Sequence, residues 1–120
     1  MIVDTNVLIY LSKYALNPDQ VLNNASSISI ITRIEVLGFK FQNDDEHKLL
    51  LSICNELKII SLTNLIAEET IRIRRNNRIK LPDAIIFATA LVEQVPLLTN
   101  NIKDFKEINS EVELINPFDL

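Results

Sequence analysis

Short runs of β-branched and aliphatic residues alternate with longer helical patterns along the 120 residues of this chain. Helices are expected at about 5–14, 18–25, 32–42, 45–56, 64–78 and 82–94. The strand candidates are Ile2–Val3, 29–31, 58–60, 96–98 and 113–115. Strands separated by helices of this length predict right-handed βαβ crossovers and a parallel sheet with helices on both faces. Because no repeat or linker interrupts the alternation, we expect one α/β domain over residues 1–120.

Three helix starts carry sequence signals. The segment 32–35, Thr-Arg-Ile-Glu, predicts a capping box, and 104–107, Asp-Phe-Lys-Glu, predicts a second one for a short C-terminal helix. Pro82 suits the first position of a helix. The segment from Pro82 to Val92 is apolar on almost every side, which predicts a buried central helix.

The scarcity of three residue types excludes several kinds of site. Gly38 is the only glycine, so the glycine-rich loops that bind phosphates or dinucleotides are excluded. Cys54 and His47 are also single, which excludes an intrachain disulfide and the usual Cys/His zinc site. Carboxylates therefore remain as the expected metal ligands.

The start of the chain and its apolar runs predict a cytoplasmic protein. Met1–Asp4 lacks the basic region of a signal peptide, and runs such as 84–88 are far too short to span a bilayer. An unpaired cysteine suits a reducing compartment. We expect no membrane association.

Four acidic residues follow strands or open helices in a way that brings them to one edge of the predicted sheet. These candidate acids are Asp4, Glu35, Asp83 and Asp104. Carboxylates that converge raise one another's pKa unless a cation binds between them. Mg²⁺ takes oxygen ligands and retains waters that can be activated. The pattern therefore predicts metal-assisted hydrolysis of a phosphodiester.

Each candidate acid also has a purely structural interpretation. Taken singly, Glu35 and Asp104 are better explained as members of capping boxes, and Asp83 is favoured in a first helical turn by the macrodipole. Asp4 lies between apolar residues at a strand end, where a buried charge is costly unless it is paired or bound to metal. Asp83 precedes an apolar helix and meets the same cost. These two are the strongest site candidates.

Other polar residues have simpler explanations. The acidic run 43–46 is typical of an exposed helix N-terminus, and His47 is expected on the surface. Cys54 fits the apolar face of a helix. Nothing in the spacing places His47 beside a nucleophile, so Ser/His or Cys/His catalysis is not supported.

Four segments, in this order, resemble a known family. They are 1–9 (MIVDTNVLI), 32–38 (TRIEVLG), 81–90 (LPDAIIFATA) and 98–105 (LTNNIKDF). Together they resemble the PIN-domain ribonucleases and, more narrowly, the VapC-type toxins of type II toxin–antitoxin pairs. The resemblance covers the whole chain. It implies a Rossmann-like three-layer α/β/α sandwich and endonucleolytic cleavage of RNA with Mg²⁺ or Mn²⁺.

The resemblance also assigns roles to residues. Asp4 and Asp83 would be the principal metal ligands, Glu35 would complete the site, and Asp104 would lie near a second metal or its waters. Asn6 and Thr99 match positions that support the ligands by hydrogen bonds. Asn101 departs from the pattern, because many relatives carry an acid there. This departure leaves a one-metal mechanism open.

Family membership further implies a homodimer and an antitoxin that blocks the site, with structured RNAs such as transfer RNA among the substrates. Two alternatives remain. A degenerate PIN domain would bind RNA or protein without cutting. A receiver-type phosphoacceptor domain is disfavoured, because Asp4 lacks an acidic neighbour and 58–62 contains no aspartate.

A basic stretch precedes Asp83: Arg72, Arg74, Arg75, Arg78 and Lys80. Part of it is explained as the exposed C-terminus of a helix, where cations suit the dipole. Its position also predicts contact with RNA phosphates or with an acidic antitoxin segment. The net charge of −4, from 12 basic and 16 acidic residues, equals the number of candidate acids, so the rest of the chain is neutral.

Overall fold

The computed structural model describes residues 1–22, 26–40, 43–108 and 110–120. Its strands are β1 (Ile2–Val3), β2 (Ser27–Ser29), β3 (Lys58–Ile60), β4 (Leu97–Leu98) and β5 (Leu114–Ile115). Within these residues they form one sheet in the order β3-β2-β1-β4-β5, and all neighbouring strands are parallel. Ile2 of the central strand is in register with Ser27 on one side and Leu97 on the other.

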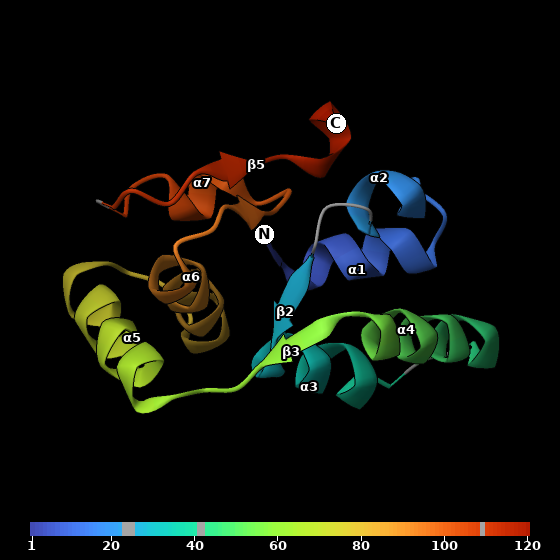
Figure 1. Cartoon of the computed structure of the whole chain (residues 1–120), viewed down its shortest axis with the longest axis horizontal. Coiled ribbons are helices and arrows are strands. Elements are labelled where there is room, and N and C mark those ends of the chain that lie inside the picture. Colours follow the sequence, from blue (N-terminus) through green and yellow to red (C-terminus); the bar gives the residue numbers. More distant parts are fainter. Residues whose placement is uncertain (23–25, 41–42, 109) are drawn as a thin grey trace.

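Helices cover both faces of this sheet (Figure 1). They are α1 (Thr5–Ser12), α2 (Pro18–Leu22), α3 (Ile30–Gly38), α4 (Asp44–Glu56), α5 (Asn64–Asn76), α6 (Leu81–Glu93) and α7 (Ile102–Phe105), followed by the 3₁₀ turn η1 (Pro117–Asp119). In Figure 1, α5 and α6 lie on one side of the strands and α1, α2 and α4 on the other. The expected three-layer α/β/α architecture is confirmed.

Two apolar clusters hold the layers together, one on each face of the sheet. Ile2 and Leu97 pack with Phe87 of α6 in the first cluster. Val3 and Leu98, the next residues along the same strands, pack with helices α1 and α4 in the second. Successive side chains of a strand point to opposite faces, so both residues of β1 are buried. Whatever follows β1 therefore emerges from the interior of the protein.

Helix α6 is the buried central helix that its sequence predicts. Every residue from Ala84 to Ala90 is buried, and the hydroxyl of Thr89 is satisfied by donating to the carbonyl of Ile85 at 2.7 Å. The helix begins at Leu81, so Pro82 occupies the second helical position rather than the first. Either position suits proline, since the first turn has no intrahelical acceptor for its missing N–H.

Both predicted capping boxes are wrong. Helix α3 begins two residues earlier than expected, and Ser29 caps it by accepting from the backbone N–H of Ile31 at 3.2 Å. Thr32 therefore lies inside the helix. Asn101 is the N-cap of α7, which places Asp104 in the first turn of that helix. Strand β2 ends at Ser29, two residues before its predicted end, so α3 begins earlier, whereas β4 ends at Leu98 as predicted and three residues separate it from α7.

Other boundaries differ by only a few residues. The second strand spans 27–29 rather than 29–31, and α1 ends at Ser12 rather than at 14. The helix ends predicted at 25 and 42 both lie outside the described residues. Asn43 caps α4 and is followed by three first-turn acids, as predicted, and Cys54 is buried. No helix in the described part of the chain is long and apolar enough to cross a membrane.

We expect truncation of Phe87 to destabilise the fold severely. This ring is 1% exposed and stacks on Phe105 with a centroid separation of 5.8 Å. Phe87→Ala should lower the free energy of unfolding by about 3–5 kcal/mol, because the cavity adds to the lost burial. Urea unfolding followed by circular dichroism measures this change. Leu65→Ala, at a side chain 60% exposed on α5, is the control and should change stability by less than about 1 kcal/mol.

Candidate active site

Asp4 is the buried carboxylate at the centre of the site. It follows β1 directly, its backbone N–H donates to the carbonyl of Leu98 at 2.9 Å, and only 3% of the residue is exposed. Asp4 is also the N-cap of α1, and its Oδ1 accepts from the backbone N–H of Thr5 at 2.8 Å. The end of the central strand thus fixes both the backbone and one carboxylate oxygen.

The other oxygen of Asp4 accepts two side-chain hydrogen bonds. Thr99 Oγ1 donates to Oδ2 at 2.7 Å and Asn6 Nδ2 donates at 3.1 Å. The hydroxyl of Thr99, which follows β4, in turn accepts from the backbone N–H of Asn101 at 2.9 Å. Asn6 is held as well, since its Oδ1 accepts from the backbone N–H of Asn100 at 3.3 Å. Asn6 and Thr99 therefore orient Asp4 from two sides.

Glu35 is held by Thr5, which in turn contacts Thr32, and the sequence analysis assigned neither threonine to the site. Thr5 Oγ1 donates to Glu35 Oε1 at 2.7 Å and lies 3.2 Å from Thr32 Oγ1. Thr32 is completely buried. It precedes Glu35 by three residues, so the two share one face of α3. This spacing was visible in the sequence, but the capping interpretation of Thr32 concealed it.

Asp83 and Asp104 line one hollow together. Asp83 is half-buried in the first turn of α6, and Asp104 accepts from the side-chain amide of Asn101. The hollow has a volume of about 750 Å³ and is called here the Asp83 hollow. Its other lining residues are Arg74, Asn77, Arg78, Ile79, Lys80, Asn101, Lys103, Glu107 and Ile108.

The four candidate acids act on one another electrostatically. Burial raises the pKa of Asp4 to about 6, and the charges of Asp83 and Glu35 add to this rise, while the hydrogen bonds from Thr99 and Thr5 oppose it. Burial also raises the pKa of Asp83, with further contributions from Glu35 and Asp104 and an opposing one from Lys80. Each of these two carboxylates therefore holds its charge at a cost.

The oxygen atoms that these four acids offer are ligands of the kind that hard divalent cations bind. All four side chains offer carboxylate oxygens, the ligands that Mg²⁺ and Mn²⁺ take in proteins. Among residues 1–22, 26–40, 43–108 and 110–120, no three acidic, histidine or cysteine side chains are arranged so that they could hold one ion. The acids are thus linked through their charges and through the hydrogen bonds of Asp4 and Glu35.

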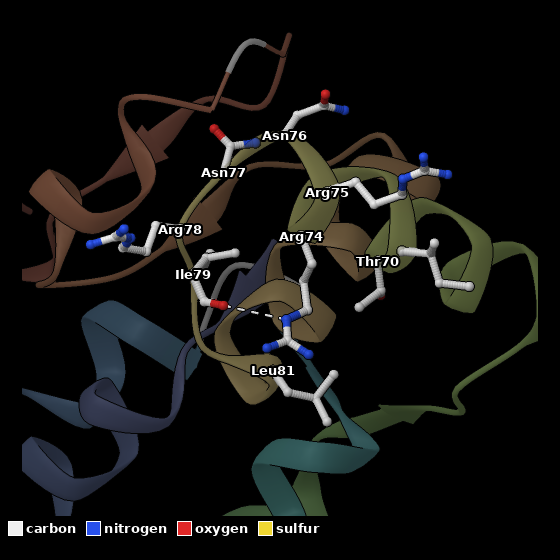
Figure 2. Close-up of a pocket in the computed structure, with 9 residues that line it drawn as sticks. Thr70, Arg74, Arg75, Asn76, Asn77, Arg78, Ile79 and Leu81 are labelled. Atoms are coloured by element: carbon white, nitrogen blue, oxygen red, sulfur yellow. Dashed lines mark hydrogen bonds between the residues drawn. The ribbon is translucent and has the colours of Figure 1, made fainter.

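The basic stretch is divided by the fold. Arg72 forms an ion pair with Glu69 of the same helix, at 2.8 Å. The end of α5 and the loop that follows it line a second hollow of about 730 Å³, called here the Arg75 hollow (Figure 2). Its lining residues are Thr70, Ile71, Arg74, Arg75, Asn76, Asn77, Arg78, Ile79 and Leu81. Lys80 instead faces the Asp83 hollow.

Comparison with known proteins identifies the family. The model of the PIN domain family matches residues 1–111. The chain belongs to the PIN domain family. The resemblance indicated by the four sequence segments is thereby confirmed. A comparison with curated proteins gives no match.

Solved structures with this fold come from toxin–antitoxin complexes. The chain is 31% identical to a chain of a toxin–antitoxin complex from Klebsiella pneumoniae, with a TM-score of 0.76 and coverage of 97% of this chain and 96% of that one. A chain of VapBC2 from Rickettsia felis, bound to a promoter DNA fragment, is 22% identical, with a TM-score of 0.81 and 96% of each chain covered. A chain of DNA-bound VapBC from Salmonella typhimurium is 19% identical, with a TM-score of 0.82 and 94% of each covered.

We expect Asp4→Asn to stabilise the metal-free PIN domain at neutral pH. The folded-state pKa lies about two units above that of the unfolded chain, so ionisation of Asp4 costs about 3 kcal/mol of folding stability. The uncharged amide removes this cost. However, its N–H group would face the side-chain N–H group of Asn6, and the loss of this hydrogen bond lowers the folding stability by about 1–2 kcal/mol. Urea unfolding in EDTA at pH 7.5 should therefore show a gain of about 1 kcal/mol.

The pH dependence provides the check on this cause. Because the folded pKa of Asp4 is the higher one, the wild type loses stability as pH rises through the window from about 4 to about 6. The difference in free energy of unfolding between Asp4→Asn and the wild type should grow across this window and remain constant above it. A wild type that is more stable than the variant at pH 7.5 would contradict the assignment.

Proposed function

We propose that this PIN domain is a VapC-type toxin nuclease that hydrolyses RNA phosphodiester bonds with Mg²⁺ or Mn²⁺. The observation that carries the proposal is the buried carboxylate of Asp4, held by three hydrogen-bond donors and raised in pKa to about 6 beside further acids. A cation would offset this unfavourable charge. The similarity to chains of toxin–antitoxin complexes supports the biological role.

Asp4 and Asp83 would bind the metal directly. Because no three such side chains in the described ranges are arranged to hold one ion, Glu35 and Asp104 would act on it through its bound waters. A carboxylate has about four acceptor sites, and three donors already contact Asp4, two of them at Oδ2. Oδ1 accepts only one of these bonds, which leaves it capacity for a metal. When bound, the ion would supply Lewis acidity and a water of lowered pKa.

The chain's own residues set the geometry around that chemistry. Thr99 and Asn6 keep Asp4 in one rotamer, and Thr5 does the same for Glu35. The positive charge of Lys80 favours the ionised form of Asp83. These partners preorganise the acids, so that less reorganisation is required when a phosphate arrives.

A protein partner is supported by a third hollow, which is lined by one of the candidate acids, Glu35. Its volume is about 910 Å³, and Thr5 and Glu35 lie on its wall together with Ile34 and Phe39. The last two side chains are 57% and 65% exposed. We propose that a cognate antitoxin covers these apolar groups and blocks Glu35, and that the toxin acts in the cytoplasm as a homodimer.

We expect Asp83→Asn to abolish cleavage of RNA. Removal of a ligand should reduce the rate by more than about 100-fold, beyond the loss typical of residues that only support a ligand. Gel analysis of total RNA and of transfer RNA incubated with protein and Mg²⁺ measures cleavage. Asp44→Asn is the matched control, because Asp44 is also a first-turn aspartate but lies exposed on α4, so it should retain activity. Full cleavage by Asp83→Asn, or in excess EDTA, would contradict the mechanism.

We also expect calorimetric titration with Mg²⁺ to give about one ion per chain. Asn101 contributes no charge, and its amide hydrogen-bonds to Asp104, so the acids available for a second ion are few. Asp4→Asn should remove the heat of binding. Two ions per chain would contradict the single site. The absence of heat from the wild type would instead favour a PIN domain that binds without cutting.

A further inference from the structure

The Asp83 hollow and the Arg75 hollow meet at the loop between α5 and α6. Four residues line both of them: Arg74, Asn77, Arg78 and Ile79. Figure 2 shows Arg78 on one side of this loop and Arg74 and Arg75 on the other. The loop therefore connects a hollow that contains two candidate acids with one whose charged lining residues are all arginines.

The cations of this loop are not neutralised within the described part of the chain. Arg75 and Arg78 are exposed and form no ion pair or side-chain hydrogen bond there. Arg74 donates only to the carbonyl of Ile79, at 3.4 Å. Arg72, by contrast, is paired with Glu69 at 2.8 Å and lines neither hollow. Unpaired guanidinium groups are suited to phosphate oxygens, which they bind as a fork.

The loop is held in shape by its own polar groups. Asn76 donates to the carbonyl of Arg72 at 2.8 Å, and Asn77 donates to the carbonyl of Ile73 at 3.0 Å. The second bond satisfies a carbonyl in the last turn of α5, which has no intrahelical partner there. Arg74 and Arg75 in the last turn of α5, and Arg78 after it, are thus displayed from an anchored backbone. Ile71 and Leu81, about half exposed, add apolar surface to the Arg75 hollow.

We infer that this loop guides the RNA strand, with its backbone passing from the Arg75 hollow over Arg78 to the acids of the Asp83 hollow. The inference rests on the proposed nuclease function. A strand that carries a phosphate at every nucleotide matches cations spread over both hollows. The Asp83 hollow also contains Lys80 and Lys103, and the proposed metal ion would offset its acids for an approaching phosphate, whereas binding of an acidic peptide is the outcome that the test below separates. The apolar side chains offer contacts to unstacked bases.

The test compares two substitutions on the same segment. Anisotropy of a labelled single-stranded RNA oligonucleotide, measured with Ca²⁺ over a series of salt concentrations, gives the affinity and its salt slope. Arg75→Gln/Arg78→Gln should bind RNA more weakly and reduce the slope by about 1.4, the value for two lost phosphate contacts on a single strand. Arg72→Gln is the matched control and should leave both quantities unchanged. Circular dichroism checks that the variants fold.

Cleavage of the same oligonucleotide with Mg²⁺ separates this inference from the proposed function. If the wild type cleaves RNA and the double variant keeps the wild-type slope, the guiding loop is refuted and the nuclease stands. If the slope falls as expected but the wild type does not cleave, the loop is supported and the nuclease is refuted. An equal loss in Arg72→Gln would overturn the inference. The inference would also be overturned if a poly-glutamate peptide needed Arg75 and Arg78 for binding and RNA did not need them.

Discussion

The burial of one carboxylate, that of Asp4, is the constraint on which the rest of the site depends. Strand β1 is central in the sheet and both of its residues face apolar layers, so the residue that follows emerges into a desolvated environment. Three donors from α1 and the end of β4 contact its oxygens. These hydrogen bonds reduce the cost of the charge, yet its pKa remains raised because burial and neighbouring acids outweigh them.

The apolar layers determine where the other acids can lie. Helix α6 is buried from Ala84 onward, so Asp83, one residue before, cannot move without disturbing the core. Glu35 is tied to α1 through the hydroxyl of Thr5. The repulsion among the acids is therefore built into rigid elements. A site of this kind is destabilising to the free chain, and the proposed metal ion would offset that cost, which is the usual conflict between stability and function.

The distribution of charge is more informative than its sum. A net charge of −4 would by itself argue against binding to nucleic acid. In the structure Asp83 and Asp104 line one hollow, and the charges of Asp83 and Glu35 act on Asp4, whereas unpaired cations gather at the end of α5 and the loop to α6. Opposite charges thus occupy neighbouring regions of one surface. An RNA strand bound there would meet cations before it reached the acids, so the local field and not the total governs its approach.

The sequence by itself determined the alternation of strands and helices and the buried central helix, and it singled out the four candidate acids, because these depend on periodicity and on motifs within a few residues. Only the tertiary structure decided that Ser29 rather than Thr32 caps α3, since the sheet fixes where β2 ends. The resemblance implied a supporting role for Thr99, and the structure shows that its hydroxyl bonds to Asp4, 95 residues away. Only the structure decided that Thr5 bonds to Glu35, 30 residues away. Likewise, pairing with Glu69 separates Arg72 from the other arginines. Contacts between distant segments depend on how whole elements pack, and no local pattern encodes that packing.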